Sequence, residues 1–400
     1  MRVRQLLFTV HMWVGLVLGV ILAVLGVTGS LLVYDDALAD LLAAPPRAVT
    51  AGMPLPLSMI ADTARAAAAE KGIEGGQVQI SIPQQKGDAV SVRIGQISPM
   101  GNMPGMAPRE GRRHREGGAP RRSRVGGAGP GGGGRGLQVF IDPVSGEVLG
   151  TRKAMLPPIL TFAHQFHGNF MMSREVGRPV VGWLGVAMLV LGVSGLVLWW
   201  PKTGQWKYAF TIRRSARGLR FHRELHAATG IWIFLVFMAV SFSGVVIAWP
   251  QAFGMNQQAG RNTLTVEPAD TKPIGPTEAV LAAQGAVPGL VARSITLPAR
   301  PDQPISVGYL ANGAINAQVL VNPYSGKVLA VRDSSASFLA WMRPVHQGLL
   351  GPVWKFLVFL TGLVPALFVT TGIIMWFKKR RRRLPQSLPV PEPVEEEALA

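Results

Sequence analysis

Long apolar runs alternate with longer polar stretches along this chain. Four runs are nearly free of charged residues, and they cover residues 6–34, 180–200, 227–249 and 353–377. A helix needs about 20 apolar residues to cross a bilayer core of about 30 Å. The pattern therefore predicts an α-helical membrane protein with a four-helix transmembrane bundle. One long segment joins the first two spans and another joins the last two.

Basic residues beside the apolar runs indicate their direction. Arg2 and Arg4 precede the first run, residues 202–223 contain Lys and Arg but no acidic residue, and Lys378–Arg383 follows the fourth run. Short basic loops stay in the cytoplasm, so both termini are expected there and the two long segments on the other side. The net charge of +18 then reflects topology and contact with membrane lipid, and nucleic acid is not an expected partner.

The two long segments contain matching motifs. Residues 137–149 and 317–329 each have the pattern of a strand, a turn of the form Asp/Asn-Pro-x-Ser-Gly, and a second strand. An alanine-rich helical stretch and two further strands are predicted before each motif. We therefore predict two copies of a small α+β domain, at 37–158 and 251–335, in an internally duplicated chain.

The apolar runs are duplicated too. His11 and Gly15 have the same spacing as His226 and Gly230. Pairs of a hydroxyl residue and a glycine recur at matching places, namely Thr28-Gly29 and Ser243-Gly244, and Ser194-Gly195 and Thr371-Gly372. Small residues of this kind let helices approach closely in lipid.

One insertion interrupts the first α+β domain. Residues 98–136 are rich in Arg and Gly, and this composition predicts a disordered surface loop. It also contains His114 and three spaced methionines, Met100, Met103 and Met106. Thioether sulfur suits Cu(I), so a copper-directed reductase or uptake component is one alternative function.

Histidine placement is the main functional signal. Six of the seven histidines fall near the ends of the spans: His11, His222 and His226 toward the cytoplasm, and His164, His167 and His346 toward the outside. The duplication equates His11 with His226 and approximately His167 with His346. Ionisable residues at membrane depth are usually functional, and neutral imidazole is a metal ligand.

Facing histidines on two helices of a bundle are a common site for b-type haem. We therefore expect two haems, one held by His11 and His226 and the other by His167 and His346. His222 and His164 stay open as alternative ligands or as partners of the haem propionates. The chain has no Cys, which excludes covalently attached haem and iron–sulfur clusters.

Three smaller expectations concern the outer ends of the spans. A helix from His167 through the second span would exceed the bilayer, so Pro179, and Pro352 in the other half, are expected to interrupt the path. Asp35 and Asp36 are predicted to be a solvated helix end. The third expectation concerns three side chains next to the outer histidines, which suit either haem propionates or a solvated turn: Arg174, Glu175 and Arg178.

Taken together, these residues resemble the PepSY-associated transmembrane helix family. The likeness rests on the His11 and His226 motifs, the two Asp/Asn-Pro-x-Ser-Gly turns and the ending from Thr371 to Trp376. It covers nearly the whole chain except the insertion and the acidic tail. The family contains iron-regulated inner-membrane proteins, some of which are ferric-siderophore reductases. The resemblance implies periplasmic PepSY domains and b-type haem on His11, His226, His167 and His346.

The predicted function is a transmembrane b-haem ferric-siderophore reductase of the bacterial inner membrane. Its partners would be a periplasmic ferric siderophore or other metal chelate and an electron donor, either a quinol or a separate reductase, because no nicotinamide or flavin fingerprint is present. A non-enzymatic PepSY scaffold that binds a peptide or a peptidase is the other alternative. The predicted parts are 1–36 (first span), 37–158, 159–201 (second span), the basic loop 202–223, 224–250 (third span), 251–335, 336–379 (fourth span) and the cytoplasmic tail 380–400.

Overall fold

The computed structural model describes residues 3–42, 44–73, 75–83, 87–95, 136–153, 156–201, 203–254, 264–311 and 315–381. The chain forms two compact units. The helical unit comprises Met1–Val27, Ala187–Met238 and Thr361–Ala400, and the sheet unit comprises Thr28–Val186 and Ala239–Leu360. The insertion 98–136, except for Gly136, and the tail after Arg381 lie outside the described residues, as do the methionines of the copper alternative and His114.

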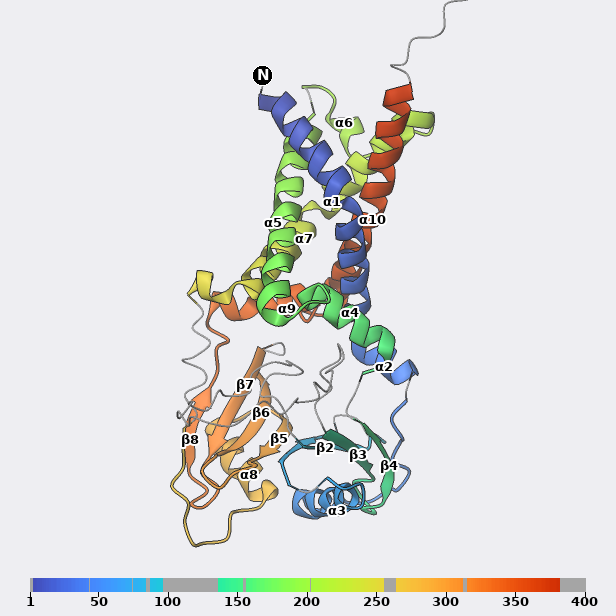
Figure 1. Ribbon diagram of the computed structural model, residues 1–400. Coiled ribbons are helices and arrows are strands. Elements are labelled where there is room, and N and C mark those ends of the chain that lie inside the picture. Colours follow the sequence, from blue (N-terminus) through green and yellow to red (C-terminus); the bar gives the residue numbers. More distant parts are fainter. Residues whose placement is uncertain are drawn as a thin grey trace, which may run out of the picture. The chain divides into compact units, whose positions relative to one another are not determined.

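Four helices are long and apolar enough to cross a membrane, counting only the described part of the chain. They are α1 (Val3–Val33), α5 (Arg174–Trp199), α7 (Gly218–Ala248) and α10 (Pro352–Arg381), shown in Figure 1. They confirm the four predicted spans.

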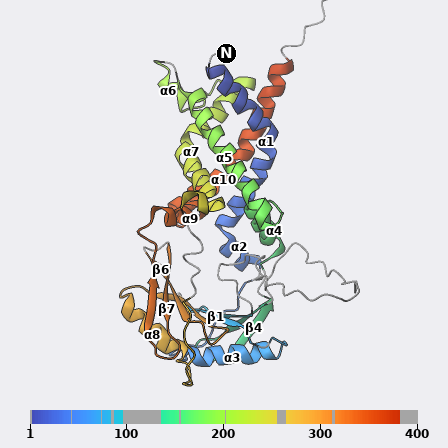
Figure 2. The same ribbon diagram turned by 60° about the vertical axis from the view of Figure 1, so that its left-hand side comes forward.

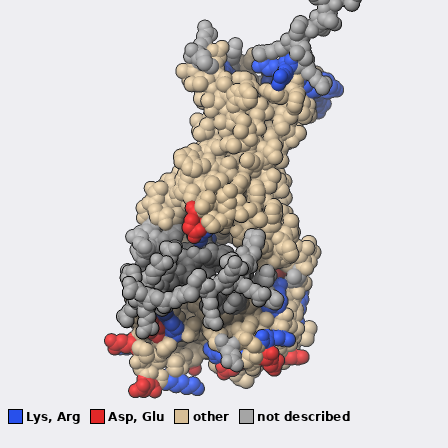
Figure 3. Space-filling model, in the orientation of Figure 1, with Lys and Arg blue, Asp and Glu red and all other residues tan. Residues whose placement is uncertain are grey.

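The surface of these helices is apolar, and Figure 3 shows almost no charged side chain along their middle parts. Large apolar side chains are exposed there, including Val17 and Val20 on α1, Trp232 and Leu235 on α7, and Val193 on α5. Contiguous exposed apolar surface of this extent marks contact with lipid or another apolar partner. The chain is therefore a membrane protein.

The strands of both predicted α+β domains form one antiparallel sheet of eight strands, in the order β4-β3-β2-β1-β5-β6-β7-β8. The first four are β1 (Gln77–Ser81), β2 (Val90–Gly95), β3 (Gly136–Ile141) and β4 (Val148–Lys153). The others are β5 (Ala292–Leu297), β6 (Ile305–Ala311), β7 (Ile315–Val321) and β8 (Val328–Arg332). β1 and β5 join the two halves, with Ile80 opposite Ile295.

Helices α3 (Leu57–Ala69) and α8 (Pro276–Ala286) pack on the same face of this sheet, as Figure 2 shows. Their alanines contact alternate strand residues, among them Ile80 and Ile295, which are fully buried. Alternation places one side of each strand in this core. Each half of the sheet unit thus has one helix followed by four strands.

The two Asp/Asn-Pro-x-Ser-Gly turns have matching hydrogen bonds. Oδ1 of Asp142 accepts from the amides of Val144 and Ser145, at 2.8 and 3.1 Å. Oδ1 of Asn322 accepts from the amides of Tyr324 and Ser325 at the same distances. These Asx turns fix the hairpins β3–β4 and β7–β8.

Acid is expected to weaken the first turn and not the second. Burial acts to raise the pKa of Asp142, but amide hydrogen bonds from Val144, Ser145 and Thr50 outweigh it and lower the pKa to about 2. A lowered pKa gives stability that is complete above the unfolded value of about 3.9 and is lost as pH falls toward the folded value. Asp142→Asn should therefore reduce the fall in melting temperature between about pH 4 and pH 2.

The measurement is thermal unfolding of the detergent-solubilised chain, followed by circular dichroism at several acidic pH values. Asp62→Asn is the control, because the Asp62 carboxylate is exposed and pairs only locally with Arg65. If wild type and Asp142→Asn lose melting temperature equally on acidification, the Asp142 carboxylate is not the titrating group.

The interruption predicted at Pro179 is wrong, because Pro179 lies inside α5. The chain breaks earlier, after α4 (Pro158–Asn169), where Phe170 and Met171 take left-handed backbone angles, with φ of 51° and 57°. Their amides bond to the carbonyls of Phe166 and Gln165 and close the helix. In the other half the break falls as predicted, between α9 (Met342–Gln347) and Pro352, the first residue of α10.

The remaining elements are short. They are α2 (Asp35–Leu42), α6 (Trp206–Ala209), and the 3₁₀ turns Pro250–Phe253 and Phe338–Trp341. The α6 turn lies in the basic loop, where the indole of Trp199 donates to the carbonyl of Ala209 at 3.0 Å.

Candidate functional site

His11 on α1 and His226 on α7 face each other within the helical unit. Their ring centroids are 6.2 Å apart and the ring planes are inclined by 72°. The ring of Phe368 on α10 lies 4.5 Å from that of His226. The structure thus brings together the two histidines that the sequence repeat equated.

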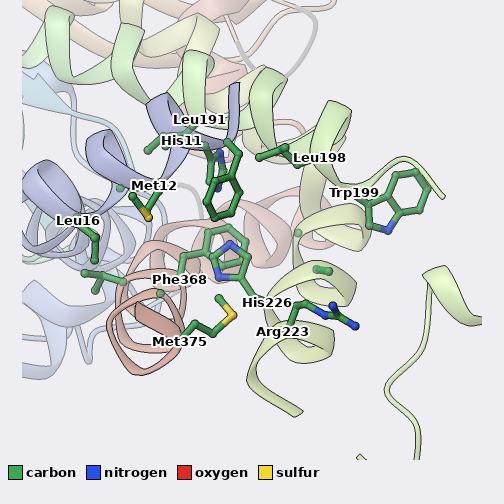
Figure 4. A pocket seen from close by; sticks show the side chains of 18 of the residues that line it. His11, Met12, Leu16, Leu191, Leu198, Trp199, Arg223, His226, Phe368 and Met375 are labelled. Carbon is green, nitrogen blue, oxygen red and sulfur yellow. The ribbon is translucent and has the colours of Figure 1, made fainter. Parts of the chain in front are cut away.

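This pair lies in a cavity of about 1870 Å³, which Figure 4 shows from close by. That volume exceeds the roughly 300–1,000 Å³ of most small-molecule pockets. Apolar side chains from all four spans line it, including Met12 and Leu16 of α1, Leu191 of α5, Phe237 of α7 and Met375 of α10. Its lining also includes basic side chains near helix ends, namely Arg4, Arg217, Arg220, Arg223 and Lys379. The cavity therefore suits a large apolar ligand that carries acidic groups.

His167 and His346 form a second pair, within the sheet unit. His167 lies in the last turn of α4 and His346 in the last turn of α9. Their ring centroids are 5.9 Å apart and the planes are inclined by 40°. Both histidines therefore come from short helices that precede a span and not from the spans themselves.

The pairs of hydroxyl residue and glycine lie against these imidazoles. Nδ1 of His11 is 2.9 Å from Oγ of Ser194, and Nδ1 of His226 is 2.8 Å from Oγ1 of Thr371. Nδ1 of His346 is 2.9 Å from the carbonyl oxygen of Val240 and 3.4 Å from Oγ of Ser243. In each case Nδ1 has a partner on another helix, so Nε2 is the nitrogen left to bind a ligand.

The glycines provide room for the rings. A Cβ atom on Gly29 would lie 2.6 Å from Cε1 of His167, and one on Gly244 would lie 2.9 Å from Cε1 of His346. On Gly195 it would be 3.3 Å from Cε1 of His11. A larger residue at Gly29 or Gly244 would therefore displace an imidazole.

Each histidine pair offers only two imidazoles as metal ligands. Among the residues that the structure describes, no group of three or more His, Asp or Glu side chains could hold a metal ion. Structural and catalytic sites for bare zinc use three or four protein ligands. Two opposed imidazoles instead suit a metal that brings its own equatorial ligands.

Positive charge gathers beside the second pair. The charges of Arg174 on α5 and Arg343 on α9 both act on Arg178 of α5. Burial lowers the pKa of His346, against the effect of its bond to the Val240 carbonyl, and the charge of Arg343 lowers it further. Glu175 is exposed. The arginines are placed to attract an anion, and the lowered pKa of His346 favours the neutral imidazole.

His164 is directed to another partner. Its Nε2 lies 3.3 Å from Oδ2 of Asp35 at the start of α2. Burial acts to raise the pKa of Asp35, but the hydrogen bond and charge of His164 outweigh this and lower it. Asp35 is therefore a contact of α4 with one third of its side chain still exposed, and Asp36 beside it is exposed, as expected at a helix end.

His222 lies one turn before His226 on α7. It is partly buried, its ring contacts that of Phe221, and it is not among the residues that line the cavity. Of the two close histidine pairs in the sequence, the structure thus selects His226 and His167 as the members that face a second imidazole.

A comparison with protein families identifies one match. The family model described as the PepSY-associated TM region matches residues 8–379. No curated protein matches the chain.

Proposed function

This chain belongs to the PepSY-associated transmembrane family, and from that premise we propose that it is a haem-containing membrane reductase that delivers electrons to a ferric chelate. We further propose that it lies in a bacterial inner membrane with both termini in the cytoplasm. The alternation of basic loops and long segments supports this orientation.

The spacing of the two histidine pairs carries the proposal. Imidazole nitrogen binds a first-row metal at about 2.0–2.1 Å. Two imidazoles that held one iron between them would have their nitrogens about 4 Å apart and their ring centres about 6 Å apart. The ring centroids lie 6.2 Å apart in the His11–His226 pair and 5.9 Å apart in the His167–His346 pair.

The surroundings of the first pair fit the rest of a haem, and the second pair has positive charge beside it. The cavity around His11 and His226 has apolar walls for a porphyrin and basic residues for propionates. Arg343 offers positive charge near the second pair, and its charge also acts on Arg178. Bound b-type haem would supply reversible one-electron chemistry at each pair.

The chain's own residues do the positioning. α1 carries His11 of the first pair and, 18 residues later, Gly29, which packs against His167 of the second pair. α7 repeats this arrangement with His226 and Gly244, which packs against His346. Each of these two helices therefore contributes one residue to each pair.

The proposed substrate is an Fe(III) chelate with hard oxygen donors, such as a siderophore. One-electron reduction to Fe(II) weakens such chelation and releases the metal. Outer-sphere transfer needs no open coordination position, so two histidine ligands would be compatible with it. The proposed electron donor is a quinol or a separate reductase.

The test begins with the absorbance spectrum of the full chain purified in detergent. We expect a b-type α band after reduction with dithionite, and two haems per chain by the pyridine haemochrome assay. The reduced protein should then be reoxidised anaerobically by a ferric hydroxamate while a ferrous chelator traps Fe(II). A colourless but folded preparation would refute the proposal, whereas a coloured one that is not reoxidised would refute only the substrate.

A further inference from the structure

Each histidine of the first pair contacts a hydroxyl that is itself held by its own helix. Oγ of Ser194, which lies 2.9 Å from Nδ1 of His11, donates to the carbonyl of Val190 at 2.6 Å. Oγ1 of Thr371, which lies 2.8 Å from Nδ1 of His226, donates to the carbonyl of Leu367 at 2.8 Å.

These bonds fix the direction of the contact. A hydroxyl has one hydrogen, and in both residues a carbonyl one turn earlier on the same helix accepts it. The hydroxyl oxygen must then accept from the imidazole, so Nδ1 carries the proton. A neutral imidazole has only one N–H, and its lone pair is therefore on Nε2.

We propose that Ser194 and Thr371 are positioning residues that hold His11 and His226 in the Nδ1–H tautomer and thereby set the reduction potential of the group bound between them. The inference rests on the proposed function. A hydrogen bond accepted from Nδ1–H makes the ligand more basic. A more basic ligand favours Fe(III) over Fe(II), so these hydroxyls lower the potential.

His226 gives the sharper test, because the imidazole of His11 also has a hydrogen bond to the backbone of Leu191. At His346 the carbonyl of Val240 is closer to Nδ1 than the hydroxyl of Ser243 is, at 2.9 against 3.4 Å. Removing the Ser243 hydroxyl would leave an acceptor in place. For His226, Thr371 is the partner that bonds Nδ1, and valine reproduces its shape without the hydroxyl.

Thr370 provides a matched control. It is the neighbouring residue on α10, and its exposed hydroxyl also donates to a carbonyl one turn earlier, that of Ala366 at 2.7 Å. Thr370→Val therefore makes the same chemical change in the same helix turn without touching an imidazole. Thr371→Ser is the conservative variant that restores the acceptor.

The experiment is a redox titration of the purified full chain, with haem counted in each variant. Thr371→Val should raise the midpoint potential of one haem by about 59 mV. For a one-electron couple this shift equals an about tenfold change in the relative affinity of the site for Fe(III) and Fe(II). Thr371→Ser should return it toward wild type, and Thr370→Val should leave it unchanged. Loss of one haem in Thr371→Val alone would also support the positioning role.

Three results would overturn the inference. Equal potentials in wild type and Thr371→Val, with both haems bound, would remove the hydroxyl's role and leave the proposed function intact. Equal shifts in Thr370→Val and Thr371→Val would assign the effect to the helix and not to the imidazole. A wild-type chain without haem would overturn the inference and the proposed function together.

Discussion

Replacement of His226 by alanine is expected to remove one of two haems and to abolish electron delivery to the chelate. His226 supplies one of the two imidazoles that line the cavity, so His11 alone would remain there to hold a haem in this variant. Because His167 and His346 contact each other independently, the second haem should remain. The haem count should therefore fall from two to one per chain.

His222→Ala is the matched control for this variant. His222 lies on α7 one turn before His226 but does not line the cavity. It should keep both haems and the wild-type spectrum. The retained haem in His226→Ala would also report folding, since the residues proposed to bind it belong to the sheet unit. If His222→Ala loses the haem and His226→Ala does not, our ligand assignment is wrong.

His11→Ala should give the same spectrum as His226→Ala, because both variants leave a single imidazole. The double variant should then lose no more than one haem. Additive loss beyond that would mean that the two histidines serve different sites.

The sequence was sufficient to predict the four apolar helices and which histidine rings lie beside each other. The spans follow from hydropathy, which depends on composition over about 20 residues and not on tertiary contacts. The partners follow from the repeat, because His11 and His226 occupy equivalent places in two halves that must pack together. A repeat is long-range information that local propensity lacks.

Other features could not be predicted. The two predicted α+β domains are joined by the pairing of β1 with β5. No pattern within one repeat specifies that its edge strand will pair with the edge strand of the other repeat. The end of α4 depends on left-handed Phe170 and Met171, residue types that rarely adopt this conformation. Proline was the stronger local signal, but α5 accommodates Pro179 in its second turn.

The role of the small residues was only partly predicted. Thr371-Gly372 and Ser194-Gly195 were expected to let helices approach each other, whereas their hydroxyls bond the imidazoles. The available signal was the recurrence of a hydroxyl residue before glycine at matching offsets in each half. Glycine alone explains close packing, so the repeated hydroxyl required a separate reason.

The second large effect is expected from Gly29→Ala. A Cβ at this position would lie 2.6 Å from Cε1 and 3.0 Å from Nδ1 of His167, closer than such atoms can approach. Gly29 is inside α1, where the backbone is held by helical hydrogen bonds, so the imidazole must move. Displacement of the ring from His346 should remove the haem of the second pair, or change it from two protein ligands to one.

Gly168→Ala separates this effect from a general response to alanine. Gly168 follows His167 on α4, and a Cβ there meets nothing within 4 Å. Alanine is favoured over glycine in a helix by about 1 kcal/mol, so this control should bind both haems and be at least as stable as wild type. Haem content and the low-spin signal in electron paramagnetic resonance are the measurements. Retention of both low-spin haems in Gly29→Ala would mean that His167 is not held against α1, and the second pair would then need a different ligand.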